Sequence, residues 1–276
     1  MRFKRVLLTV LFIFTIVLLL GMMPSCNKTP TTTTEQPKDP ESGTKTGPKY
    51  VAHKGYSSRY LGNTVEAFRA AANLGFYGIE TDIRMTKDGY FVCNHDATVE
   101  YANGTTKDIA TTNRAELLDD PIKNDKTNDD AFLCTFETYL QVCKQGNKIA
   151  VIELKNFINT TDARKILQVI DAKYDRQKVM FISFYYLSLQ AIQEVAPSIP
   201  LQYLSQLAND PAFENHCLAD NVSIDVKHTI LTEELVETFH DAGLEVNVWT
   251  VNDESVLQTA YQMGVDYVTT DVFYGD

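Results

Sequence analysis

The stretch "GIETDIRMTKDGYFVCNHD" (residues 78–96) indicates both the fold and the chemistry of this 276-residue chain. It begins as a β-strand, and because successive side chains of a strand point to opposite faces, Ile79 and Ile83 share one face while Glu80 and Asp82 share the other. Neighbouring carboxylates on a buried strand repel each other and lose hydration unless a cation lies between them. The stretch therefore predicts a core strand that also carries a divalent-cation site.

Outward from this stretch, short apolar strands alternate with helical segments as far as the C-terminus. The helical segments at 63–75, 232–243 and 253–264 each end in glycine, and Asn63 is the predicted N-cap of the first. Alternation of strand and helix predicts a parallel sheet. The predicted strands are residues 50–55, 78–85, 148–155, 179–184, 201–205, 221–226, 245–251 and 267–271.

Eight strands are the number that closes a (β/α)8 TIM barrel, an α/β fold. An open doubly wound sheet is the alternative, but no glycine-rich phosphate loop follows the first strand, and polar residues recur at the C-terminal ends of several strands. A polar insertion of residues 94–133 follows the second strand and is expected to cover a site or to form a surface loop. Only five residues follow Asp271, so the eighth helix is expected to be missing or vestigial.

The N-terminal part is expected to lie outside the fold. Basic residues precede an apolar run that ends near Met23, which is typical of a signal peptide over residues 1–25. The "MMPSC" that closes it predicts a lipidated Cys26, with a retained membrane helix or simple secretion as alternatives. Residues 26–48 are rich in Thr, Pro and Lys and predict a disordered tether. Residues 49–276 remain as one domain at the cell envelope, facing the periplasm or the outer surface.

Charge and cysteine content exclude some classes of protein. The formal charge is −11, and loss of the three basic residues in the first 25 makes the mature chain −14, a charge that disfavours nucleic acid and anionic lipid as partners. Besides Cys26, the spacing of the four cysteines does not resemble a zinc site, and they are expected to be buried thiols, with disulfides as the alternative. These are Cys93, Cys134, Cys143 and Cys217.

Polar residues near the ends of separate strands are expected to converge at the mouth of the barrel, because each lies on the inward-facing side of its strand. The three carboxylates among them offer only oxygen ligands, which favours Ca²⁺ or Mg²⁺ over zinc. The converging set is His53, Glu80, Asp82, Glu153, Lys155 and Trp249.

Four motifs together resemble the glycerophosphodiester phosphodiesterase family across residues 50–271. They are "AHKGYSSRYLGNTVEAF", "GIETDIRMTKDGYFVCNHD", "VIELK" and "VNVWTVND" with the later "MGVDYVTTD". The family is a (β/α)8 barrel with an insertion after the second strand. The resemblance implies metal-dependent hydrolysis of small glycerophosphodiesters to glycerol 3-phosphate and an alcohol, with water or the substrate's own glycerol hydroxyl as nucleophile.

The resemblance also implies residue roles. It makes His53 and His95 the acid–base pair, and unperturbed histidine, with a pKa of ~6.5, suits both roles near neutrality. It makes Lys155 a ligand of a phosphate oxygen and Trp249 a wall of the glycerol pocket. The metal ligands would be Glu80, Asp82 and Glu153.

Two positions depart from the family pattern. Lys54 stands where the family usually has an arginine, whose side chain can bind phosphate through two parallel hydrogen bonds. If Lys54 binds the substrate, its ammonium group contacts the phosphate without this paired geometry. Gly62 stands where the family usually has glutamate, which could change the metal or substrate preference.

Two other classes of function stay open. One is a barrel that binds a phosphodiester without cleaving it, which Lys54 and Gly62 favour and the retained histidine pair disfavours. The other is a glycoside hydrolase, for which Glu80 and Asp82 are poorly placed because they share a strand. The few apolar residues of the insertion favour a small, water-soluble substrate, and the sequence indicates no protein partner.

Overall fold

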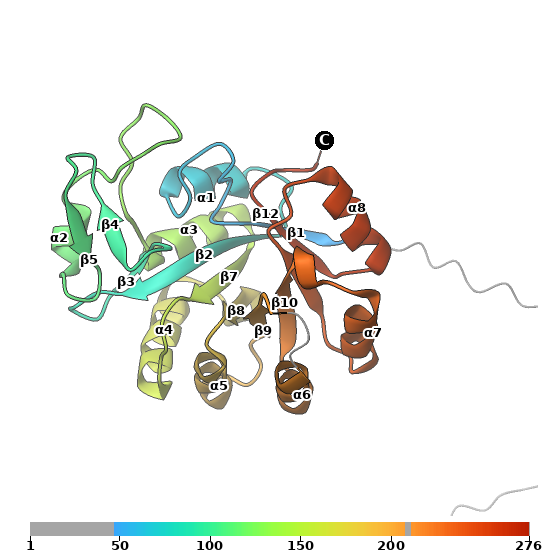
Figure 1. The fold of residues 1–276 in the computed structure, drawn as a ribbon. Helices are drawn as coiled ribbons and strands as arrows, with labels where there is room; N and C mark the ends of the chain where they lie inside the picture. Colours follow the sequence, from blue (N-terminus) through green and yellow to red (C-terminus); the bar gives the residue numbers. More distant parts are fainter. Residues whose placement is uncertain (1–46, 208–210, 276) are drawn as a thin grey trace, which may run out of the picture. The chain divides into compact units, whose positions relative to one another are not determined.

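A closed barrel of eight parallel strands forms the centre of the computed structural model, which describes residues 47–207 and 211–275 (Figure 1). The strand order is β1, β12, β11, β10, β9, β8, β7 and β2, and pairing of β1 with β2 closes the barrel. All eight predicted strands are confirmed. They are β1 (Lys49–Ala52), β2 (Gly78–Met85), β7 (Ile149–Leu154), β8 (Val179–Ser183), β9 (Leu201–Ser205), β10 (Ser223–Lys227), β11 (Val246–Trp249) and β12 (Tyr267–Thr270).

Helices connect successive strands and surround the barrel (Figure 1). No helix follows β12 within the described residues, which end at Gly275. The helices are α1 (Val65–Ala72), α3 (Phe136–Gly146), α4 (Thr160–Lys173), α5 (Tyr186–Val195), α6 (Pro211–Asp220), α7 (Glu233–Asp241) and α8 (Glu254–Met263), with short 3-10 turns η1 (Arg176–Lys178) and η2 (His228–Ile230).

The two faces of β2 serve different layers, as the sequence predicts. Ile79 and Ile83 are buried in the large apolar core that the strands share with the helices. Val51 and Val151 instead belong to a smaller apolar cluster inside the barrel. Residues in register on parallel strands point to the same face, and Glu80 is in register with Val151, so Glu80 and Asp82 also face the interior.

The insertion after β2 is a compact unit with a core of its own. It comprises β3 (Phe91–Cys93), β4 (Thr98–Glu100), β5 (Thr106–Asp108), α2 (Arg114–Leu118) and β6 (Cys134–Thr135). β3 pairs antiparallel with β2, and β6 pairs antiparallel with β3. Of the two expectations for this segment, the surface loop is therefore wrong for much of it, whereas the segment does border the hollow beside His95 and Lys54. The core of the insertion consists of Val92, Val99, Tyr101, Ile109, Leu117, Ile122, Ala131 and Leu133.

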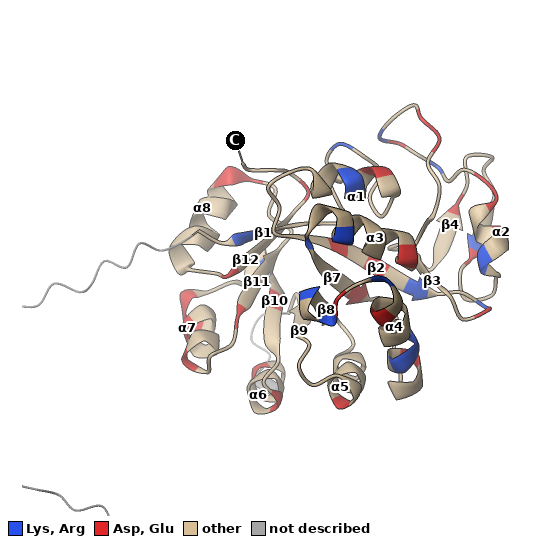
Figure 2. Cartoon of the chain, turned by 180° about the vertical axis from the view of Figure 1, so that it is seen from behind, with Lys and Arg blue, Asp and Glu red and all other residues tan. Residues whose placement is uncertain are grey.

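The outer helices carry the negative charge unevenly. Helices α6, α7 and α8 contain seven Asp and Glu and neither Lys nor Arg (Figure 2). The four predicted buried cysteines are confirmed as buried free thiols. In the part of the chain that the structure describes, no helix has the length and apolar character needed to span a bilayer. The predicted signal peptide, Cys26 and nearly all of the tether lie outside the described residues.

Candidate active site

A cavity of about 400 Å³ lies at the C-terminal ends of the barrel strands, where barrel enzymes place their chemistry. Of the eight residues proposed from the sequence for catalysis, substrate binding or metal ligation, seven line this cavity, and Asp82 is buried directly beside it. The structure thus brings together residues from five strands and their loops. The seven are His53, Lys54, Glu80, His95, Glu153, Lys155 and Trp249.

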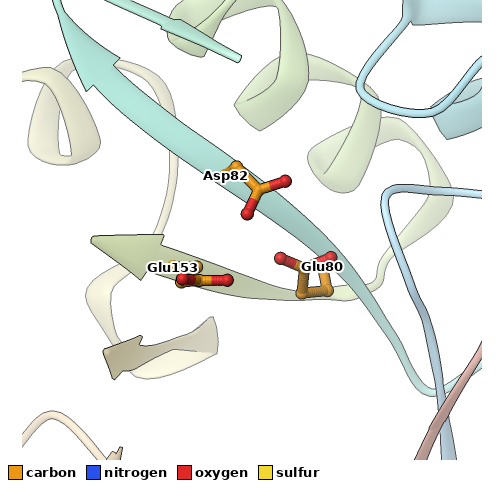
Figure 3. A group of neighbouring side chains, drawn as sticks. All are labelled: Glu80, Asp82 and Glu153. Atoms are coloured by element: carbon orange, nitrogen blue, oxygen red, sulfur yellow. The ribbon is translucent and has the colours of Figure 1, made fainter. Parts of the chain in front are cut away.

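Three carboxylates form a buried cluster in the barrel wall (Figure 3). Glu80 and Asp82 come from β2 and Glu153 from β7, and their side chains point toward one another. One oxygen of each lies within 4.8 Å of those of the other two. Oε1 of Glu80 and Oδ1 of Asp82 have no hydrogen-bond partner among the described residues. Buried carboxylate oxygens without partners are an all-oxygen donor set, which fits Ca²⁺ or Mg²⁺.

The cluster perturbs the acidity of its own members. Burial, followed by the charges of Asp82 and Glu153, raises the pKa of Glu80 well above its ordinary value. Burial and the charge of Asp82 raise the pKa of Glu153 to about 7. Burial alone would also raise the pKa of Asp82. The charges of Lys54 and Lys155 and a hydrogen bond from Asn63 outweigh burial, so the pKa of Asp82 is lowered. Without a cation, the site therefore holds protons near neutrality.

Lys155 partly neutralises the cluster. Its Nζ lies 3.0 Å from Oε1 of Glu153 and 3.6 Å from Oδ1 of Asp82. Its side chain is only 13% exposed, so these contacts are weakly screened by water. The ammonium group remains on the cavity wall, where it can also reach an anion bound there.

The loop after β1 supports the cluster through two residues in the left-handed backbone region. Lys54 (φ 55°) donates its backbone N–H to Oε2 of Glu80 at 2.7 Å. Asn63 (φ 62°) donates from Nδ2 to Asp82 at 2.7 Å. The prediction of Asn63 as the N-cap of α1 is wrong, because Thr64 caps the helix and accepts from the N–H of Ala67. The side chain of Asn63 serves the carboxylates instead.

The two departures from the family pattern are neighbours in space. A Cβ atom on Gly62 would lie 2.9 Å from Cβ of Lys54, closer than such atoms approach each other. A glutamate at position 62 would therefore require Lys54 to move. The side chain of Lys54 lines both the cavity and an adjoining hollow against the insertion, which His95 also borders.

His95 reaches the cavity from the start of the insertion. The antiparallel return of β3 along β2 brings it back over the carboxylates. Arg84 holds this segment, donating from Nε at 3.0 Å and from a terminal nitrogen at 2.6 Å to the carbonyl oxygen of His95. Nδ1 of His95 lies 2.8 Å from Oδ1 of Asp96, and the His95 side chain is 51% exposed. Arg84 was assigned no role from the sequence, although its place on the strand face of Glu80 and Asp82 indicated one.

His53 also lines the cavity, and it is paired with Asp271. Nδ1 of His53 is 2.7 Å from Oδ1 of Asp271, just past the end of β12. Sequence reasoning missed Asp271, yet closure of the barrel makes β1 and β12 neighbours and could have identified it.

The remaining wall of the cavity combines apolar side chains with a buried carboxyl group. Trp249 packs edge-on against Phe184 with ring centroids 5.6 Å apart, and its Nε1 donates to the carbonyl oxygen of Asp225. The side chain of Asp225 is fully buried, and neither of its oxygens has a hydrogen-bond partner in the described chain. Burial, and then the charge of Glu153, raise the pKa of Asp225 well above its ordinary value. Sequence reasoning did not single out Asp225 or Phe184.

Comparison with known proteins identifies the family of the chain. Residues 53–273 match the glycerophosphoryl diester phosphodiesterase family. The chain is 27% identical to a glycerophosphodiester phosphodiesterase of Caldanaerobacter subterraneus subsp. tengcongensis, over 80% of this chain and 93% of that protein. It is also 27% identical to one of Bacillus altitudinis, over 81% and 94% of the two chains.

Solved structures of phosphodiesterases share the fold. A glycerophosphodiester phosphodiesterase from Parabacteroides distasonis superposes with a TM-score of 0.70 at 26% identity, covering 82% of this chain and 93% of that one. A phosphodiesterase from Oleispira antarctica, solved with the product sn-glycerol-3-phosphate, gives a TM-score of 0.71 at 22% identity over 82% and 93%. The chain is therefore an enzyme of the glycerophosphoryl diester phosphodiesterase family.

Proposed function

We propose that the protein hydrolyses glycerophosphodiesters to glycerol 3-phosphate and an alcohol, using a divalent cation and a pair of histidines. The observation that carries the proposal is one cavity lined by both histidines and by Glu80 and Glu153, with Asp82, the third carboxylate of the cluster, buried beside it. A glycoside hydrolase would need two carboxylates on either side of a glycosidic bond, whereas these three gather at one point.

Each group has a definite task in this reaction. Glu80, Asp82 and Glu153 would hold Ca²⁺ or Mg²⁺, which when bound offsets the charge of the phosphodiester and stabilises the more highly charged transition state. Lys155 adds a second positive charge for a phosphate oxygen. His53 and His95 both line the cavity beside the cluster, so one can accept the proton of the nucleophile while the other donates to the departing alcohol.

The other walls define where the parts of the substrate lie. Trp249 and Phe184 offer an apolar wall that fits the carbon face of a glycerol unit. Lys54 faces both the cavity and the polar hollow against the insertion, so it can contact the phosphate or the departing head group. The relatives named above, including the one solved with sn-glycerol-3-phosphate, support a small glycerophosphodiester as the substrate.

The test measures glycerol 3-phosphate release from glycerophosphocholine and glycerophosphoethanolamine by the folded unit, residues 45–276. Assays with Ca²⁺, with Mg²⁺ and with EDTA are compared for the wild type and the variants His53→Ala and His95→Ala. His240→Ala is the matched control, because His240 lies on the outer helix α7, does not line the cavity and pairs with Asp266. We expect cation-dependent release that both cavity variants lose and the control keeps. Substrate binding without release by the wild type would instead indicate a binding protein.

We also propose that residues 1–25 are a signal peptide and that a lipid on Cys26 anchors the domain at the cell envelope through the following tether. The basic residues, apolar run and terminal cysteine of the sequence support this. Incorporation of a labelled fatty acid by the full chain, and its loss in Cys26→Ser, is the expected result. Labelling that persists in the variant would contradict the anchor.

A further inference from the structure

Asp271 is the residue most closely engaged with His53. β1 and β12 are adjacent, and the N–H of His53 donates to the carbonyl oxygen of Thr270 at 2.9 Å, which fixes the backbone of the two strand ends together. Nδ1 of His53 then meets Oδ1 of Asp271 at 2.7 Å, and Ser57 donates its hydroxyl to the same oxygen at 2.7 Å. The two side chains are 24% and 28% exposed, so water reaches the contact only in part.

The charge state of Asp271 determines which nitrogen of His53 carries a proton. Burial would raise the pKa of Asp271, but hydrogen bonds from His53, Ser57 and Asn252, together with the charge of His53, hold it well below its usual value. An ionised carboxylate only accepts hydrogen bonds, so Nδ1 of His53 must be the donor. Nε2 is then the ring nitrogen left for the cavity that His53 lines.

We propose that Asp271 is a positioning residue that fixes the Nδ1–H tautomer of His53, so that Nε2 faces the cavity as a proton acceptor. The inference rests on the proposed function, in which His53 takes part in acid–base catalysis. It assigns to His53 the role of base, and it leaves His95 as the partner that supplies a proton.

Asn252 makes this proposal unusually specific. Its Oδ1 accepts from the backbone N–H of Asp271 at 2.9 Å and from the hydroxyl of Thr270 at 3.2 Å. Its Nδ2 is therefore the group that donates to Oδ2 of Asp271, at 2.5 Å. The orientation of the Asn252 amide is thus set by its own partners and not by Asp271 alone.

This orientation predicts what the variant Asp271→Asn does. The new amide oxygen must take the place of Oδ2 to accept from Asn252, so the new NH₂ group takes the place of Oδ1 and faces His53. An NH₂ group donates to Nδ1 and drives the proton of the neutral imidazole to Nε2, where it blocks proton acceptance. Asp271→Ala removes the carboxylate without adding a donor, so either tautomer can form.

The kinetic test compares Asp271→Asn with Asp271→Ala on glycerophosphocholine at saturating cation. We expect kcat to fall by about 100-fold or more in Asp271→Asn, the usual scale for loss of a general base, with KM nearly unchanged and with a larger loss than in Asp271→Ala. If Asp271 had a purely structural role, Asp271→Ala would lose more kcat than Asp271→Asn, because asparagine keeps the shape of aspartate. Asp266→Asn is the matched control. Oδ2 of Asp266 lies 2.9 Å from Nε2 of His240, and neither residue lines the cavity.

A second readout does not depend on turnover. The ¹⁵N chemical shifts of the His53 ring, assigned by comparison with His53→Ala, report which nitrogen is protonated. We expect an unprotonated Nε2 in the neutral wild type and a protonated Nε2 in Asp271→Asn. A wild-type proton on Nε2, or Asp271→Asn that matches or exceeds Asp271→Ala in kcat, would overturn the proposal. Failure of the wild type to cleave any diester would instead refute the proposed function, and the spectra would still decide the tautomer.

Discussion

The carboxylate cluster predicts that the metal-free protein loses stability as pH rises from 5 to 8. The pKa of Glu153 is about 7 in the folded chain, against an ordinary value of 4.5. Between these two values the folded state binds more protons than the unfolded state, so the free energy of unfolding falls with increasing pH. The pKa values of Glu80 and Asp225 are also raised, and both act in the same direction.

The magnitude follows from the shift. The difference for Glu153 is about 2.5 pH units at ~1.4 kcal/mol each, or about 3 kcal/mol lost by pH 7. Glu153 is only 9% exposed, so screening by water removes little of this. For a domain of this size, about 3 kcal/mol corresponds to a fall in Tm of roughly 6–12 °C. A bound cation should reverse the loss, by about 2.7 kcal/mol at a concentration 100 times its Kd.

The assay is thermal unfolding at pH 5 and pH 8, in EDTA and in Ca²⁺ or Mg²⁺. We expect Tm in EDTA to be lower at pH 8, and the gain on adding cation to be larger at pH 8, because protons no longer compete for the carboxylates. The variant Glu153→Gln should show a weaker pH dependence of Tm in EDTA and a smaller rise in Tm on addition of cation. Glu194→Gln, at an exposed position of α5, is the matched control and should behave as the wild type.

Two results would refute this reasoning. A metal-free Tm that stays constant or rises from pH 5 to pH 8 would show that the cluster is not held protonated. An equal cation effect in Glu153→Gln and the wild type would show that the cation binds elsewhere.

Three further substitutions test the scaffold. Tyr139→Phe should lower the free energy of unfolding in urea by about 1 kcal/mol, because the buried hydroxyl donates to a backbone carbonyl of β2 at 2.7 Å. Gly55→Ala should lower the free energy of unfolding by more than about 2 kcal/mol in the same assay, since φ is +81° and the new Cβ would lie 2.6 Å from the backbone of Ala67. The control Gly89→Ala has the same φ but its new Cβ meets no atom, so it should cost only about 1 kcal/mol. Equal losses of stability in the two variants would contradict the clash. Asp225→Asn should raise Tm more at pH 8 than at pH 5, because it removes a buried carboxyl that resists ionisation, and a lower Tm at pH 8 would indicate that the carboxylate has a partner.

The barrel and most of its site could be predicted from the sequence because both depend on local patterns. Strand periodicity places Glu80 and Asp82 on the inner face wherever β2 lies, and the C-terminal ends of parallel strands share one rim. The insertion was harder to predict, because its small core joins apolar residues that are scattered among polar ones. No short window of sequence shows that Val92 and Leu133 pack in one cluster.

The supporting residues of the site could not be predicted in the same way. Asn63 stands one residue before the true N-cap, so its sequence context resembles a helix start, and only the left-handed backbone turns its amide toward Asp82. Asp271 contacts His53 across 218 positions of sequence, a pairing that only closure of the barrel creates. Asp225 is the exception, because it alternates with Ile224 and Val226 in the pattern that identifies Glu80 and Asp82, and the same rule could have singled it out.

The way the insertion joins the barrel bears on how this enzyme could acquire new substrates. Cys93 and Cys134 are direct cross-strand partners, so the segment between them leaves and re-enters the fold at points about 5 Å apart. A segment with such close ends can be lengthened, shortened or replaced at a small entropic cost and without displacing β2. His95 lies only two residues beyond Cys93, at the very start of this segment. Residues 97–132 can thus diverge as an exchangeable module, altering what enters the cavity while His53 and His95, the residues proposed for proton transfer, are inherited unchanged.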